Sequence, residues 1–228
     1  DLEGTPQNSS NWDKAQALGY QLAVHTHKAL DAGKEMAVTD ISVFAKTLQL
    51  PVDNRAFQIA FALGIFTRGA FGYDKDLPIN KHNVPQLPTE IALIRIGEVS
   101  FYTMPGELDP EVLIGGYDKS KTFGYPFIHD KKYEQDILDK LKNAPKGPYL
   151  KERIPGTFKF FAGLGNDEVG YIIPAWNYKL HATQPYLKEA DGDHYEETNG
   201  LGPKTLPLLF EAYEVIFNTL KPYKPPTQ

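Results

Sequence analysis

The feature that most constrains the fold is a pair of apolar stretches within residues 89–104, which meet at Gly97. Their β-branched and aromatic content, with a glycine at the junction, predicts a β-hairpin. The second stretch stops abruptly at Pro105 and Gly106, because proline cannot donate to a sheet and glycine favours a turn. The sequence therefore predicts a strand that ends in a sharp turn, with Glu107 directly after it.

Two other stretches predict further strands. Residues 40–52 are rich in β-branched and aromatic residues, and residues 158–164 are almost wholly apolar. A continuous apolar strand is typical of a sheet whose two faces are both covered. Together with the hairpin, these stretches predict a sheet with a covered apolar strand.

Helical periodicity accounts for much of the remaining chain. Ser10 and Asp13 resemble a capping box before the first helix, and the low charge of residues 54–66 indicates a buried helix. Helices are predicted at residues 11–33, 54–66, 131–144 and 206–221, with a short helical turn after Glu107. Residues 67–88 carry several Gly and Pro and predict a long loop. The expected fold class is α/β, a mixed sheet with covering helices.

Composition narrows the class of protein. The 228 residues are 41% hydrophobic and 23% charged, as in globular proteins, which suits one large α/β domain or two small ones. The absence of cysteine excludes disulfides, thiolate zinc sites and a cysteine nucleophile. A net charge of −5 argues against nucleic acid as a partner, because binding it requires clustered Lys and Arg. No apolar window is long enough for a transmembrane segment.

Two loops at strand ends carry the residues best suited to chemistry. Glu107 lies beside glycine at a strand end, so its carboxylate can serve as a metal ligand or general base. Tyr171 ends the glycine-rich residues 165–171, which follow the apolar strand, and open α/β sheets bind ligands at such loops. The alternatives are that Glu107 caps the next helix, where the macrodipole favours it, and that Tyr171 is a core or surface aromatic.

The histidines form no metal motif. His25 and His27 resemble an HxH chelate, but helix residues two apart point about 200° apart, so we interpret them as surface residues. The others lie in loops or beside an acidic segment, at spacings that match no metal site: His82, His129, His181 and His194. Motifs of common hydrolases and nucleotide-binding proteins are absent from the sequence.

Three segments follow one another in a definite order: residues 96–108 (IGEVSFYTMPGEL), 160–174 (FFAGLGNDEVGYIIP) and 194–203 (HYEETNGLGP). They contain PGE at a strand end, then GLxNxxxxY, then YE in a segment closed by GP. This ordered set resembles the neutral/alkaline (non-lysosomal) ceramidase family, and residues 41–52 resemble the family's segment upstream of PGE. The likeness covers nearly the whole chain and implies part of a larger ceramidase-like catalytic domain.

The resemblance implies a zinc-dependent amide hydrolase acting on N-acyl sphingoid (ceramide-like) lipids. Glu107 and Tyr171 match two zinc ligands of the family, and Tyr195 matches a catalytic tyrosine near the scissile amide. In such a site, zinc-bound water with a pKa lowered toward about 7 attacks the amide carbonyl, and a phenol stabilises the oxyanion. The charge of the metal also makes a phenolate ligand reasonable.

The family's remaining zinc ligands are histidines in a context that this sequence does not contain, so we expect them in residues N-terminal to Asp1. The chain begins without methionine, and we expect a processed product or a fragment. Residues 1–221 are then the C-terminal half of a ceramidase-like amidase domain, inactive alone, and residues 222–228 a proline-rich tail. The expected partners are a lipid amide substrate and the N-terminal half of the same precursor. The family implies a secreted, periplasmic or cell-surface location.

Two alternatives stay open. One is a non-catalytic lipid-binding or surface-interaction protein that keeps the scaffold without a complete metal centre. The other is a hydrolase of a peptide or another small amide, because the segment between Tyr171 and Tyr195 is longer than expected for the family. A lone half-domain is also expected to expose apolar sheet or helix surface.

Overall fold

The computed structural model describes residues 10–36, 40–74, 76–80, 82–115, 144, 146–192 and 194–220. The chain divides into two compact units, Asp1–Val38 and Thr39–Gln228. Nearly all of the predicted helix at residues 131–144, and the whole predicted tail at residues 222–228, lie outside the described residues.

The first unit holds the helix α1 (Asn11–Asp31). The Ser10 hydroxyl accepts a hydrogen bond from the Asp13 N–H at 3.2 Å, and the Asp13 carboxylate accepts one from the Ser10 N–H at 3.2 Å. The predicted capping box is therefore confirmed, and it satisfies N–H groups that a helix start leaves unpaired. None of the residues of α1 is buried, so apolar side chains such as Trp12 and Leu22 are exposed. Among the described residues, no helix combines the length and the apolar character needed to cross a membrane.

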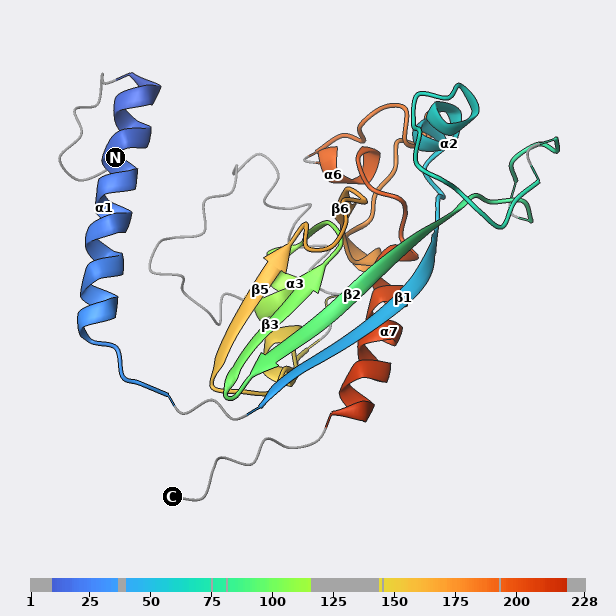
Figure 1. Ribbon diagram of the computed structural model, residues 1–228. Helices are drawn as coiled ribbons and strands as arrows, with labels where there is room; N and C mark the ends of the chain where they lie inside the picture. Colours follow the sequence, from blue (N-terminus) through green and yellow to red (C-terminus); the bar gives the residue numbers. More distant parts are fainter. Residues whose placement is uncertain are drawn as a thin grey trace. The chain divides into compact units, whose positions relative to one another are not determined.

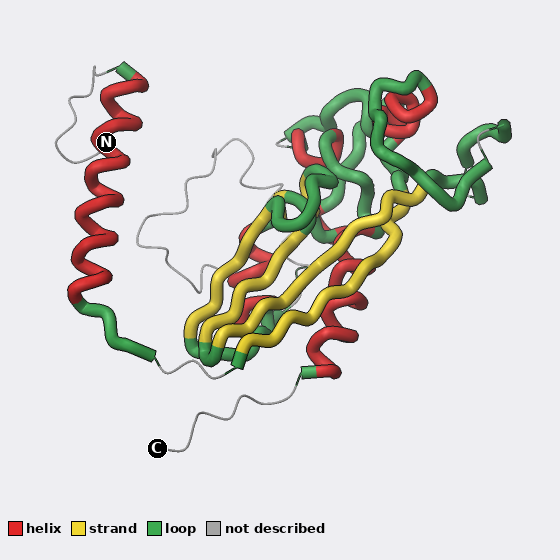
Figure 2. The backbone as a smooth tube through the Cα atoms, in the orientation of Figure 1, coloured by secondary structure: helices red, strands yellow, loops and turns green. Residues whose placement is uncertain are grey.

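A four-stranded mixed sheet forms the centre of the second unit, in the order β1-β2-β3-β5 (Figure 1, Figure 2). Its strands are β1 (Ile41–Pro51), β2 (Gln86–Ile96), β3 (Val99–Met104) and β5 (Phe158–Gly163). β1 and β3 both pair antiparallel with β2, and the predicted hairpin of β2 and β3 turns at Gly97, whose φ is 56°. β3 and β5 pair parallel, so their carboxyl ends meet at the same edge of the sheet.

Helices cover one face of this sheet, which we call the inner face (Figure 1). α7 (Thr205–Thr219) packs against β1 and β2, and its Tyr213 hydroxyl donates a hydrogen bond to the Thr103 carbonyl of β3. The shorter helices are α2 (Arg55–Ala62), α3 (Pro110–Ile114), α5 (Leu150–Arg153), α6 (Tyr195–Thr198) and the 3-10 helix η2 (Ala175–Asn177). A second, two-stranded parallel sheet joins β4 (Glu107–Leu108) to β6 (Tyr171–Ile172). The predicted α/β class with a mixed sheet and covering helices is confirmed.

The core lies between the inner face and α7. Successive side chains of a strand point to opposite faces, so alternate residues of each strand enter the core. The four-stranded sheet contributes large, fully buried side chains to this core: Leu50, Ile91, Leu93, Tyr102 and Met104. From α7, Leu209 and Tyr213 pack with them. Burying one such leucine stabilises a fold by about 1.5–3 kcal/mol, so this layer fixes the sheet on which the loops of the site stand.

The opposite, outer face of the sheet carries apolar residues that are exposed or partly exposed at the end near the hairpin turn. One row of paired residues crosses all four strands and consists of Val43, Ile94, Phe101 and Phe160; a second consists of Ile41, Ile96, Val99 and Phe158. Phe158 and Phe160 are 54% and 51% exposed. The prediction that both faces of the strand at residues 158–164 are covered is therefore wrong for the part of the chain that the structure describes.

The predicted buried helix at residues 54–66 is shorter and less buried than expected. α2 ends at Ala62, and Gln58 is its one buried residue. Its aromatic residues form a local cluster instead, because the rings of Phe57 and Phe61 lie edge-on to that of Phe66 at centroid distances of 5.3 and 5.2 Å. The helix ends because Gly64, with a φ of 69°, turns the chain out of it, and Phe66 then packs against the aromatic residues of α2.

Candidate functional site

The loops that follow β3 and β5 lie at one edge of the sheet and are hydrogen-bonded to each other. The Leu164 N–H donates to the Gly106 carbonyl at 3.1 Å, and the Val169 N–H donates to the Pro105 carbonyl at 2.8 Å. Gly106 is tightly enclosed, since a Cβ atom there would lie 2.2 Å from the Gly170 carbonyl oxygen. The glycine of the PGE motif therefore permits the close approach of the two loops.

This approach places Glu107 beside Tyr171. The two residues are direct partners in the parallel pairing of β4 and β6, so their side chains leave the same face of the small sheet. The Glu107 N–H donates to the Gly170 carbonyl at 3.1 Å, which holds the start of β4 against the loop before β6. Two candidates from separate loops thus become neighbours.

Tyr195 completes a cluster with these two residues. It is the first residue of α6, and its ring lies edge-on to the Tyr171 ring with centroids 5.8 Å apart. The Tyr171 N–H donates to the Asn199 carbonyl at 3.1 Å, which ties β6 to the end of α6. The Tyr195 side chain is 48% exposed, so its phenol is accessible to a ligand. All three site residues named from the sequence lie together, while their chemical roles stay predictions.

Asp109, rather than Glu107, caps α3. The Asp109 carboxylate accepts a hydrogen bond from the Glu111 N–H at 3.1 Å, and Pro110 occupies the start of the helix. The alternative that Glu107 caps this helix is therefore wrong. Asp followed by Pro is a common helix start, and this signal could have identified the cap from the sequence.

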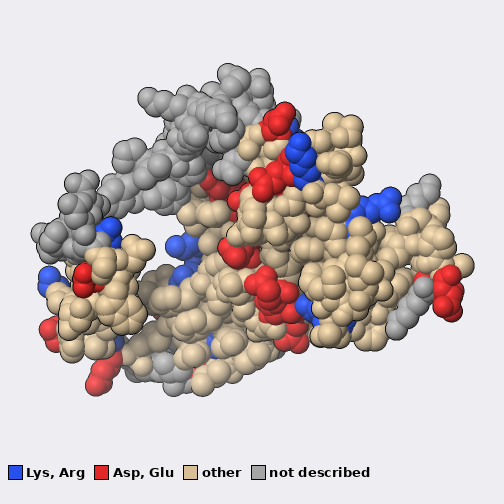
Figure 3. Space-filling model, turned by 90° about the horizontal axis from the view of Figure 1, so that it is seen from above, with Lys and Arg blue, Asp and Glu red and all other residues tan. Residues whose placement is uncertain are grey.

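Negative charge gathers around the site. Burial and then the nearby carboxylates of Glu107 and Glu196 raise the pKa of the Tyr171 phenol above its usual value. Asp109 adds little to this charge, because burial and the adjacent Glu111 raise its pKa to about 8 and so favour the neutral carboxyl at neutral pH. Figure 3, which looks down on this end of the molecule, shows acidic side chains grouped on the surface. A cation is the ligand that such surroundings attract.

Glu107 and Tyr171 are neighbouring side chains with oxygen atoms of the kind that a metal ion can bind. A catalytic zinc site normally has three protein ligands and commonly includes histidine. In the described ranges, no group of three or more His, Cys, Asp or Glu side chains could hold a metal ion. The pair therefore fits as part of a zinc site, and completing that site requires further donors.

The histidines that the sequence analysis set aside have other surroundings. His25 and His27 are exposed on α1, as helical spacing predicted. His181 Nδ1 accepts a hydrogen bond from the Gln184 N–H at 3.2 Å and so closes a local turn. His129 lies outside the described residues.

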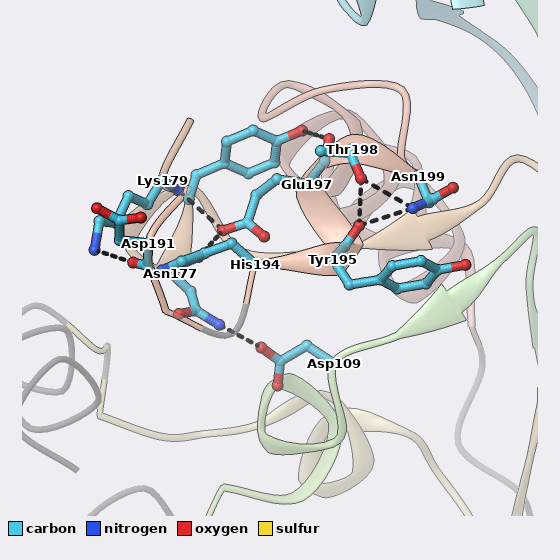
Figure 4. A network of polar contacts seen from close by, with 10 residues as sticks. Asp109, Asn177, Lys179, Asp191, His194, Tyr195, Glu197, Thr198 and Asn199 are labelled. Atoms are coloured by element: carbon cyan, nitrogen blue, oxygen red, sulfur yellow. Dashed lines mark hydrogen bonds and ion pairs between the residues drawn. The ribbon is translucent and has the colours of Figure 1, made fainter. Parts of the chain in front are cut away.

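His194 and Glu197 form a buried polar pair in the segment that carries Tyr195 (Figure 4). His194 Nδ1 lies 2.7 Å from Glu197 Oε1, and the two side chains are 0% and 4% exposed. Glu197 Oε1 also accepts a hydrogen bond from the Lys179 N–H at 3.0 Å. Sequence reasoning did not single out this pair, although a spacing of three residues brings side chains together on a helical turn.

A cavity of about 400 Å³ opens at the same edge of the sheet. Its lining mixes polar and apolar surface and comprises Thr47, Leu48, Gln49, Pro88, Thr89, Glu90, Asn166 and Asp167. Asn166, the asparagine of the GLxNxxxxY motif, donates to Glu90 Oε1 at 3.1 Å, and Arg68 binds the Asp167 carboxylate at 3.0 and 2.8 Å. The second motif therefore contributes Tyr171 to the tyrosine cluster and Asn166 to the lining of the cavity.

The fold and the cluster define a mixed α/β protein with a carboxylate and two tyrosines at one edge of its sheet. Comparison with models of protein families, with curated proteins and with solved structures finds no match to the chain. The likeness to ceramidases therefore rests on the three ordered motifs.

Proposed function

We propose that the chain is part of a zinc-dependent amide hydrolase that acts on N-acyl sphingoid (ceramide-like) lipids. The observation that carries this proposal is the direct pairing of Glu107 with Tyr171, together with the edge-on contact of Tyr171 with Tyr195. The three motifs named these residues from distant parts of the chain, and an accidental likeness gives no reason for them to meet.

In this proposal Glu107 and Tyr171 hold the zinc ion. Carboxylates are common zinc ligands, and a phenol becomes a ligand when the charge of a metal displaces its proton. When bound, zinc acts as a Lewis acid and lowers the pKa of water toward about 7, which is the chemistry that amide hydrolysis needs. The chain's own part is to align two oxygen donors, which the pairing of β4 with β6 does through the backbone.

Tyr195 is the catalytic residue of the proposal. Its phenol can donate a hydrogen bond to the oxyanion that develops when an amide carbonyl is attacked. Contact with Tyr171 fixes one edge of the ring, and the 48% exposure of the side chain leaves the hydroxyl accessible to a substrate. Such a donor is effective because it is already in place when the charge forms.

The proposed partner is the N-terminal half of the same precursor, which brings the histidine ligands. The two-donor site supports this proposal, and so does the exposed outer face of the sheet. That face presents two apolar rows, and Phe101 stacks on Phe160 with centroids 5.1 Å apart. Extended apolar surface of this kind marks a site that packs against protein or lipid, and in this proposal it packs against the N-terminal half. A ceramidase-like enzyme of this type is expected at the cell surface, in the periplasm or outside the cell.

The substrate class follows from the resemblance, and the cavity supports it. Hydroxyl, amide and carboxylate groups line the cavity, among them Thr47, Gln49 and Glu90, and they suit the hydroxyl groups of a sphingoid amide. A peptide or another small amide is the alternative substrate within the same reaction class.

A non-catalytic lipid-binding or surface-interaction protein is the second candidate, favoured by the exposed apolar face and the two-donor site. The test is hydrolysis of short-chain ceramide and of an unrelated acyl amide by the protein that joins this chain to its N-terminal half. We expect ceramide to be hydrolysed, with kcat lowered about 10²–10³-fold by Tyr195→Phe. Tyr20→Phe, on exposed α1, is the control and should have no effect.

Each other outcome of this assay decides against part of the proposal. Hydrolysis of neither amide would favour the non-catalytic candidate. Preference for the unrelated amide would keep the reaction and change the substrate class. Full activity of Tyr195→Phe would remove the role assigned to that residue.

A further inference from the structure

The helix that carries Tyr195 is too short to be stable by itself. α6 has four residues, and an isolated helical turn is unfavourable because nucleation fixes several residues for one hydrogen bond. The Tyr195 ring nevertheless meets Tyr171 at a defined angle, 75° between the ring planes. The contacts that hold α6 therefore determine where the phenol lies.

One side of α6 is held by the buried pair of His194 and Glu197. Glu197 Oε1 lies 2.7 Å from His194 Nδ1 and accepts from the Lys179 N–H at 3.0 Å. The Tyr178 hydroxyl donates to the Glu197 carbonyl at 3.4 Å. A buried carboxylate strongly favours the conformation in which both of its hydrogen-bond partners are kept. Leaving it unpaired would cost more free energy than the loss of an ordinary hydrogen bond.

The end of α6 is tied to two other elements. Asn54, the N-cap of α2 and fully buried, donates through its side chain to the Thr198 carbonyl at 3.0 Å and the Gly200 carbonyl at 2.8 Å. Asn199 Nδ2 and Thr198 Oγ1 donate to the Tyr195 carbonyl at 2.9 and 2.8 Å. These bonds fix the backbone of Tyr195 but do not contact its ring.

The buried pair anchors α6 on the side that lies opposite the Tyr195 ring. His194 directly precedes Tyr195, and Glu197 lies two residues beyond it. Figure 4 shows the Tyr195 side chain pointing away from Glu197 and His194, so the pair and the phenol occupy opposite sides of the turn. Anchoring one side of a single turn sets the direction of the other.

We propose that His194 and Glu197 are positioning residues for Tyr195, which hold α6 so that the phenol stays edge-on to Tyr171. The inference concerns the orientation of the ring, and its meaning for catalysis rests on the proposed hydrolase function. Neither positioning residue has to touch the substrate for this role.

The test uses the full 228-residue chain with isotope-labelled tyrosine rings, in the absence of zinc and substrate. The measured quantity is the NMR cross-peak between the rings of Tyr171 and Tyr195. Glu197→Ala should lose this cross-peak, whereas Glu197→Gln, which keeps an acceptor oxygen for the His194 and Lys179 donors, should retain it. Glu211→Ala, an exposed position on α7, is the matched control and should also retain it.

A merely structural role would lower the melting temperature of Glu197→Ala and leave the cross-peak unchanged, and that result would overturn the proposal. If Glu197→Ala does not fold, His194→Gln decides in the same way: loss of the cross-peak in the folded variant supports positioning, and its retention overturns it. Because this readout needs no activity, it stands apart from the hydrolase proposal. In an active enzyme, Glu197→Ala should additionally lower kcat with KM unchanged.

Discussion

Replacing Gly106 with alanine is expected to part β4 from β6 and so to move Glu107 away from Tyr171. A Cβ atom at residue 106 would lie 2.2 Å from the Gly170 carbonyl oxygen and 3.1 Å from the Ile172 side chain. A carbon and an oxygen in contact lie about 3.3 Å apart, so the two backbones must separate by about 1 Å.

That shift lengthens the 3.1 Å hydrogen bond from the Glu107 N–H to the Gly170 carbonyl beyond the normal range. Losing this bond costs about 0.5–1.5 kcal/mol, and overpacking a filled site costs about 1–3 kcal/mol. We therefore expect the free energy of unfolding of the second unit to fall by about 2–4 kcal/mol and Tm to fall by about 5–10 °C.

Urea unfolding followed by circular dichroism measures this free energy, and NMR titration of labelled tyrosine rings measures the pKa of Tyr171. Burial and the adjacent Glu107 hold that pKa above its usual value, so it should fall in Gly106→Ala. Gly163→Ala is the matched control, because a Cβ there meets its nearest neighbours at 3.4 and 3.6 Å, and it should change stability by less than about 0.5 kcal/mol. Equal stability of the two variants, with an unchanged Tyr171 titration, would show that Gly106 does not hold β4 against β6.

Further predictions concern the core of the second unit. Leu209→Ala, at a fully buried position, should lower the free energy of unfolding in urea by about 2–5 kcal/mol, whereas Val215→Ala, 48% exposed on the same helix, should change it by about 0.5 kcal/mol or less. Tyr213→Phe loses the hydrogen bond to the Thr103 carbonyl and should cost about 0.5–1.5 kcal/mol, whereas Tyr102→Phe removes a buried hydroxyl that makes no hydrogen bond and should cost less. Burial raises the pKa of Tyr102 to about 12. The stability that the protonated phenol contributes is therefore complete below pH about 10, where an unfolded tyrosine titrates, and is lost as the pH rises toward the folded value. Tyr102→Phe should unfold at a higher pH than the wild type when followed by circular dichroism, and equal alkaline midpoints would contradict this account.

Local signals predicted the elements of the fold well. The capping box of Ser10 and Asp13, the hairpin turn at Gly97 and the periodicity of α7 each depend on residues close in sequence. The sheet order was harder to foresee, because the parallel pairing of β3 with β5 joins strands separated by a long connection. The sequence pattern predicted a mixed sheet but not the order of its strands.

Burial was predicted less well than secondary structure. Phe158 and Phe160 led to the prediction of a covered apolar strand, but both are exposed. The composition of a strand does not tell whether the same chain covers its apolar face. The helix α2 was predicted too long, because Phe66 follows its apolar pattern in the sequence. In the structure Phe66 lies beyond the end of the helix and packs against Phe57.

The residues of the candidate site were predicted from motifs, and their proximity was not. Glu107, Tyr171 and Tyr195 meet through backbone pairing between segments far apart in sequence, which no local pattern encodes. Asp109 was overlooked although its position before a proline is a helix-start signal, and Glu197 was overlooked because burial of a carboxylate depends on its tertiary partners.

Zinc content, measured by elemental analysis, tests whether Glu107 and Tyr171 form part of a zinc site. We predict weak binding to the 228-residue chain alone and about one zinc per molecule of the protein that joins it to its N-terminal half, because a catalytic site needs about three protein ligands. Glu107→Gln should remove that zinc and the amidase activity. The control Glu98→Gln lies at the hairpin turn, at the opposite end of β3, and should remove neither. Tight stoichiometric zinc in the chain alone, or zinc and activity both intact in Glu107→Gln, would contradict the account.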